Sequence, residues 1–151
     1  MLGALPLVAC ATAPAQPPAP RLGPPQVVVA WSICAVDTTP DGRDLDDGGV
    51  SVTLFARGAT PERAVIGHVT GSCWPSGPGT PPPLDCRDPH VDRRTAITAR
   101  RAERTLIVER RDQPTDADGW STAPEAPAVE VAALVLPVGA ELAAGRAPSC
   151  P

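Results

Sequence analysis

The chain has 151 residues, a formal net charge of −4, 21 prolines, 13 glycines and no lysine. This length suits a single domain, and the proline and glycine content favours strands and turns over the long helices of an all-α fold. The acidic balance and the small share of aromatic residues argue against a nucleic-acid-binding protein.

The N-terminal segment, residues 1–9, is apolar and is followed directly by Cys10. The order Leu7, Val8, Ala9, Cys10 resembles the lipobox of bacterial lipoproteins, in which the cysteine is diacylated and becomes the mature N-terminus. The resemblance implies a signal segment at 1–9, lipidation of Cys10, and export to the cell envelope with the membrane as a partner through the lipid. No basic residue precedes the apolar run, and an upstream start codon would supply one.

The next segment, residues 10–25, is dominated by proline. Such a sequence forms an extended, solvated spacer of about 3.1 Å per residue, so it would hold a domain roughly 40 Å from a bilayer. We therefore expect a tether at 10–25 and a single β-rich domain at 26–151. A disordered tail without an anchor would have the same composition.

The folded segment is predicted to be a series of strands. Alternating or β-branched apolar runs bounded by Gly, Pro and Asp cover 27–36, 50–57, 63–70 and 129–136. Residues 93–101 and 104–111 fit the two arms of a hairpin somewhat better than one charged helix. The predicted fold is all-β: a small antiparallel, meander-like β-sandwich or barrel with a long Pro-rich loop. In a meander, the loops 37–49, 71–92 and 112–119 would gather at one end of the sheet.

Four cysteines remain once Cys10 is set aside for lipid: Cys34, Cys73, Cys86 and Cys150. An even number is typical of disulfides in an exported protein. The sequence leaves three pairings open, and locality favours Cys73 with Cys86, which leaves Cys34 with Cys150. The predicted fold is therefore disulfide-stabilised.

Two metal sites are conceivable from the residue types. Calcium prefers carboxylate oxygens, and the acidic loops 37–49 and 112–119 offer candidates at Asp41, Asp44, Asp46, Asp116 and Asp118. Neither loop has the glutamate of a complete calcium loop, and Asp is common in ordinary turns. Zinc would use two imidazoles and two thiols, at His68, Cys73, Cys86 and His90. In an exported protein those thiols are expected to form a disulfide instead.

Residues 87–111 carry eight arginines and a local charge of +4. A basic face on this segment would bind an acidic polysaccharide, a phosphate headgroup or an acidic loop of another subunit, or it would simply keep the strands soluble. The candidates are Arg93, Arg94, Arg100, Arg101, Arg104, Arg110 and Arg111.

No catalytic motif is present in the sequence, which lacks a G-x-S-x-G elbow, a P-loop, a dinucleotide fingerprint and H-E-x-x-H. Trp31, Trp74 and Trp120 fit packing or a carbohydrate platform equally well. We therefore expect a non-enzymatic, envelope-anchored lipoprotein without a cofactor, binding a protein or an envelope polymer. A metal-binding domain and an accessory subunit of a larger envelope complex are the alternatives.

Overall fold

The computed structural model describes residues 22–88 and 92–151. This part of the chain contains nine strands and no helix. The strands are β1 (Gln26–Thr38), β2 (Asp44–Arg57), β3 (Arg63–Thr70), β4 (Ser72–Pro75), β5 (Leu84–Asp88), β6 (Arg93–Ala102), β7 (Thr105–Pro114), β8 (Val129–Val135) and β9 (Glu141–Ala144). Cys10, His90 and most of the proposed tether lie outside the described residues. Consistent with the strand-only fold, no described helix is long and apolar enough to cross a membrane.

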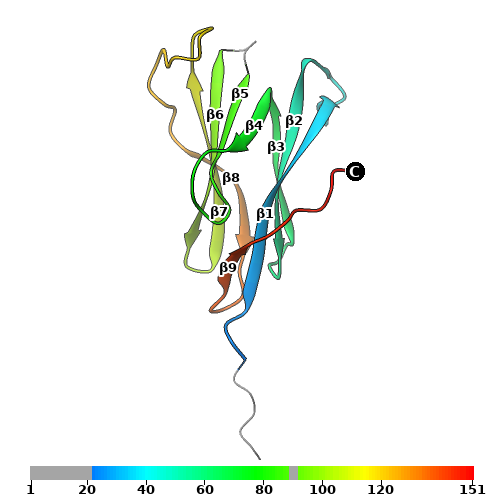
Figure 1. Cartoon of the computed structure of the whole chain (residues 1–151), viewed down its shortest axis with the longest axis vertical. Helices are drawn as coiled ribbons and strands as arrows, with labels where there is room; N and C mark the ends of the chain where they lie inside the picture. Colours follow the sequence, from blue (N-terminus) through cyan, green and yellow to red (C-terminus); the bar gives the residue numbers. More distant parts are fainter. Residues whose placement is uncertain (1–21, 89–91) are drawn as a thin grey trace, which may run out of the picture.

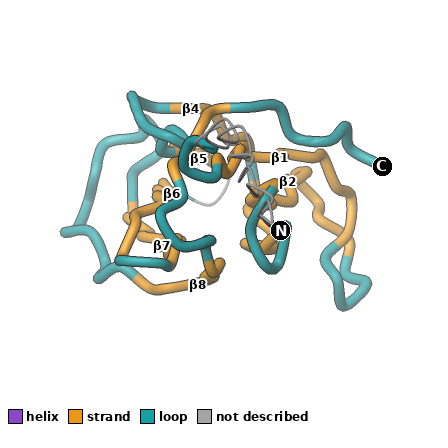
Figure 2. Tube along the Cα trace, turned by 90° about the horizontal axis from the view of Figure 1, so that it is seen from below, coloured by secondary structure: helices purple, strands orange, loops and turns teal. Residues whose placement is uncertain are grey.

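The strands form two sheets packed as a sandwich (Figure 1). Sheet A has the order β3-β2-β1-β9, and sheet B has the order β4-β5-β6-β7-β8. Figure 2, turned by 90°, shows β5 to β8 grouped apart from β1 and β2, as expected for two layers. The predicted all-β, disulfide-stabilised sandwich is confirmed.

The core lies between the two sheets because alternate residues of each strand point inward. Leu54 of β2, Ile97 of β6 and Leu106 of β7 are almost completely buried there. Each such side chain stabilises the fold by about 1.5–3 kcal/mol relative to an exposed one. The period-2 pattern that predicts 50–57 as a strand corresponds to this inward-facing row.

Residues 93–111 form a hairpin rather than a helix. β6 pairs with β7 from Arg93 opposite Pro114 to Ala102 opposite Thr105. The segment 71–92, expected to be one loop, instead holds β4 and β5, with a Pro-rich turn between them. The pairing is also not wholly antiparallel, because β9 runs parallel to the start of β1. The first and last strands of the chain are therefore neighbours in sheet A.

Two disulfides cross-link the sandwich: Cys34–Cys150 and Cys73–Cys86. This is the pairing that sequence locality favours. Cys73 and Cys86 lie directly opposite each other on β4 and β5, and Cys86 is buried in the core. The bonds are compatible with an exported protein in an oxidising compartment.

Beyond Val29, the edge of β1 that faces away from β2 is covered by the C-terminal tail and not by a strand. β9 pairs only with Gln26–Val29, and the last backbone hydrogen bond runs from the N–H of Gly145 to the carbonyl of Val29. No backbone bond of the described residues joins the tail to β1 beyond that point. The tail returns to β1 at Cys150, leaving a slot of about 490 Å³ against Trp31.

Candidate functional site

The outer face of sheet B carries the charged residues of β5 and β6. Leu84 and Cys86 of β5 point into the core, so Asp85 and Arg87, which alternate with them, lie on the opposite face. Arg94 of β6 is the register partner of Arg87. Two guanidinium groups from adjacent strands are therefore brought to the same face.

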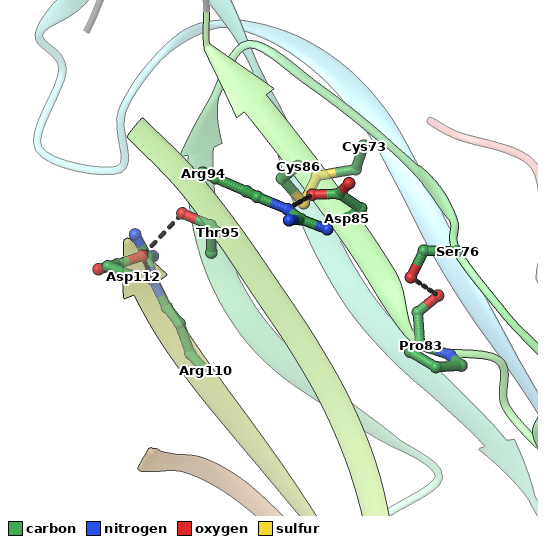
Figure 3. The surroundings of a disulfide bond; sticks show 9 residues. All are labelled: Cys73, Ser76, Pro83, Asp85, Cys86, Arg94, Thr95, Arg110 and Asp112. Carbon is green, nitrogen blue, oxygen red and sulfur yellow. Dashed lines mark hydrogen bonds and ion pairs between the residues drawn. A yellow bond between two sulfur atoms is a disulfide. The ribbon is translucent and has the colours of Figure 1, made fainter. Parts of the chain in front are cut away.

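One buried carboxylate is shared by these two arginines. The Asp85 side chain is only 7% exposed, and its Oδ1 accepts a hydrogen bond from Nε of Arg94 at 2.8 Å (Figure 3). Nη2 of Arg87 lies 3.4 Å from the other carboxylate oxygen. The hydrogen bond to Asp85 raises the pKa of Arg94, and this effect is larger than the lowering of the pKa by burial. Both guanidinium groups therefore face a single carboxylate.

A hollow of about 190 Å³ opens at the end of sheet B, next to this cluster. Its walls are formed by Arg87, Arg93, Arg94, Asp88 and the loop 115–119, which contains Asp116 and Asp118. The loop is fixed by Asp116, whose Oδ1 accepts hydrogen bonds from the N–H groups of Asp118 and Trp120. The walls of the hollow are thus set by paired strands and a hydrogen-bonded turn.

Two tryptophans lie beside the hollow. The guanidinium carbon of Arg87 lies over the ring of Trp74, 5.8 Å from its centroid, and Trp74 is 40% exposed. Trp120, next in the chain to Gly119 of the hollow's wall, is 75% exposed. We call the set Arg87, Arg93, Arg94, Trp74, Trp120 and the 115–119 loop the Arg–Trp surface. Large aromatic and arginine side chains together are typical of binding surfaces.

The predicted basic face is divided among several environments. Of the seven arginines predicted for this face, only Arg93 and Arg94 line the hollow. Arg100, farther along β6, is paired with Glu109, and Arg111 of β7 lies 3.8 Å from Glu125. The remaining three have intramolecular partners: Arg101 donates to the carbonyl of Ala140, Arg104 to that of Leu136, and Arg110 to the Asp112 carboxylate.

Asp112 belongs to a separate polar row on the inner face of sheet B. The buried hydroxyl of Thr95 donates to its Oδ1 at 2.7 Å, and Nε of Arg110 donates to the same oxygen at 3.1 Å (Figure 3). Burial alone would raise the pKa of Asp112, but these bonds and the charges of Arg110 and Arg93 outweigh it and lower the pKa.

The acidic loops are not brought together. They lie at the same end of the molecule, but the loop after β1 and the loop after β7 are on opposite sides (Figure 1). Asp41 is paired with Arg43, and Asp116 caps its own turn. Asp44 begins β2, and the side chain of Asp46 is not described. Among the side chains that the structure describes, no group of three or more His, Cys, Asp or Glu is arranged to hold a metal ion.

The zinc candidates are also separated. Cys73 and Cys86 are joined to each other, which removes both thiolates as ligands. His68 of β3 lies on the outer face of sheet A, where it lines a hollow of about 450 Å³ with Ser51 and Thr53. Its Nδ1 is buried and has no hydrogen-bond partner among the residues that the structure describes.

Comparison with known proteins gives no relative. No protein-family model, curated protein or solved structure matches the chain. Function is therefore inferred from the residues of this chain alone.

Sequence reasoning missed one member of the Arg–Trp surface, Arg87, and left Trp74 between packing and a carbohydrate platform. The candidate basic face does not include Arg87 because the sequence patterns do not predict β5, and they do not predict β4, which carries Trp74. The usable signal is the alternation of Leu84 and Cys86 with Asp85 and Arg87, which is a short period-2 pattern.

Proposed function

We propose that this chain is an exported bacterial lipoprotein whose β-sandwich works without catalysis, by binding a component of the cell envelope. The observation that carries the proposal is the Arg–Trp surface. It combines three arginines, two exposed tryptophans and a hollow on a scaffold held by two disulfides. Rigid scaffolds that present such side chains lose little conformational entropy on binding.

The position of the surface agrees with a tethered domain. Residues 22–25 leave the sandwich at the end opposite the loop after β7 (Figure 1). A lipid on Cys10 and a tether through residues 10–25 would therefore present the hollow away from the bilayer. A binding domain oriented in this way can reach polymers or proteins in the envelope.

The anchor is tested by metabolic labelling with a palmitate analogue. Wild type should take up the label, and Cys10→Ser should not. Absence of label from wild type expressed with its upstream coding sequence would refute the anchored form of the proposal.

Binding is tested by retention of the full chain on an insoluble envelope-polymer fraction. We expect wild type to be retained and Arg87→Gln to be retained less. Arg63→Gln is the matched control, since it removes the same charge from an exposed position on sheet A. Equal retention of all three proteins, or a reproducible turnover abolished by a single substitution, would contradict a non-enzymatic binding role for the surface.

A further inference from the structure

We infer that the hollow of the Arg–Trp surface takes one uronic-acid unit of an acidic polysaccharide. The inference rests on the proposed function and specifies its ligand class. Three features of the surface point to this chemistry: the exposed guanidinium groups of Arg87 and Arg94, the aspartates within the same hollow, and the aromatic rings at its side.

The exposed guanidinium groups favour a ligand that carries an anionic group. Arg87 and Arg94 share the single carboxylate of Asp85, and both side chains remain substantially exposed, at 50% and 41%. Each keeps donors that are not used by Asp85, because a guanidinium carries five N–H groups. A planar carboxylate accepts two parallel hydrogen bonds from such a fork, so a carboxylated ligand fits it well.

The aspartates limit how much negative charge the ligand can carry. Asp88, Asp116 and Asp118 line the same hollow as the arginines. A densely charged polyanion such as polyphosphate would be repelled by these carboxylates. A sugar acid carries one carboxylate per ring and several hydroxyl groups, and hydroxyls donate hydrogen bonds to aspartate oxygens. The mixed lining therefore favours a ligand with one charge and many donors.

The tryptophans favour a ring over an extended acidic peptide. Trp120 is 75% exposed, and Trp74, which has the Arg87 guanidinium over its ring, is 40% exposed. An indole offers a broad apolar face with a polar edge, which matches the apolar face and polar rim of a pyranose ring. An extended acidic peptide would satisfy the arginines and leave the exposed indole of Trp120 in water.

The size of the hollow limits how many sugar units of the polymer it can hold. Its volume of about 190 Å³ is below the roughly 300 Å³ at which pockets for drug-sized ligands begin. The hollow thus suits one sugar ring, and adjoining units of the polymer would lie across the outer face of sheet B.

The inference is tested by titrating the full chain with a trimer of galacturonic acid and with a trimer of galactose as the neutral control. We expect measurable binding of the acidic trimer and binding of the neutral trimer at least about tenfold weaker, because it lacks the carboxylate. Added salt should weaken the acidic complex. Equal affinity for the two trimers would overturn the inference.

Two variants locate the site. Arg87→Gln should weaken binding of the acidic trimer about tenfold, and Trp120→Ala at least about threefold. Trp120 is so exposed that its loss should leave folding intact. Arg63→Gln, on the other sheet, should bind as wild type does. Weakening by Arg63→Gln equal to that by Arg87→Gln would overturn the assigned location.

Further probes separate this inference from the proposed function. If wild type is retained on envelope polymer but prefers polyphosphate or polyglutamate to the acidic trimer, the uronic-acid assignment fails and the binding function stands. If wild type is not retained on envelope material at all, the proposed function fails first.

Discussion

The indole Nε1 of Trp31 donates a hydrogen bond to the carbonyl oxygen of Pro82, across a distance of 2.6 Å. Trp31 belongs to β1 of sheet A, and Pro82 to the Pro-rich turn between β4 and β5 of sheet B. The bond therefore ties the two layers together at the edge where β1 has no strand neighbour. The ring of Trp31 also packs against the core.

Trp31→Phe should lower the free energy of unfolding by about 1–2 kcal/mol. The substitution removes the donor to Pro82 and part of the packed ring. Urea unfolding followed by circular dichroism measures the change. Trp120→Phe, at an exposed position, is the control and should stay within about 0.5 kcal/mol of wild type. Equal effects of the two substitutions would contradict the role given to Trp31.

The double variant Cys34→Ser with Cys150→Ser should lose about 4–5 kcal/mol of stability, because the bond closes a loop spanning a sequence separation of 116. It should also self-associate, since release of the tail exposes the edge of β1. Size-exclusion chromatography in the cold detects the larger species. Cys73→Ser with Cys86→Ser leaves the tail pinned and should remain monomeric at the same concentration. Self-association of both variants alike would argue against edge exposure as the cause.

The stability of wild type should fall in acid partly through Asp112. Its folded-state pKa is lowered, so its contribution is complete above the ordinary value of 3.8 and is lost as the pH falls through the lowered pKa. Asp112→Asn lacks this contribution at all pH values. The difference in urea midpoint between wild type and variant should therefore be largest near neutral pH and shrink below pH of about 3. A difference that is constant with pH would contradict the assignment.

Arg94→Gln should destabilise the sandwich by about 1–3 kcal/mol, because it leaves the buried Asp85 carboxylate with only the longer contact to Arg87. Adding Asp85→Asn should recover part of the loss, since a neutral amide does not need a cation. Thermal and urea unfolding of the two single variants and the double variant form the required cycle. Strictly additive losses would show that the pair is not coupled.

Much of the fold could be predicted from periodicity. The run 63–70 coincides with β3, and the runs 27–36 and 129–136 mark β1 and β8 to within two residues at each end. The three strands that were missed are short. β4 and β9 have four residues each, and their conformation is set by pairing with β5 and β1 rather than by their own sequences. The parallel pairing of β9 with the start of β1 joins the two ends of the domain, so no local sequence pattern predicts it.

The site was less predictable, because it depends on which face of a sheet each side chain occupies. Arg93 and Arg94 were expected on a basic face and line the hollow, whereas Arg101 and Arg104 bind carbonyl groups near β8 and β9. Only the strand register distinguishes these cases. The same holds for tryptophan: the sequence does not tell the partly buried Trp31 from the exposed Trp120.

The nested order of the two disulfides constrains how the protein matures. If the chain enters an oxidising compartment N-terminus first, Cys34 meets Cys73 and Cys86 long before Cys150 arrives. Rapid oxidation of neighbouring cysteines would then produce a Cys34–Cys73 bond, and the native pairs would form only after thiol exchange. The yield of correctly bonded protein should therefore depend on a disulfide isomerase, or on a thiol reagent that allows bonds to reshuffle.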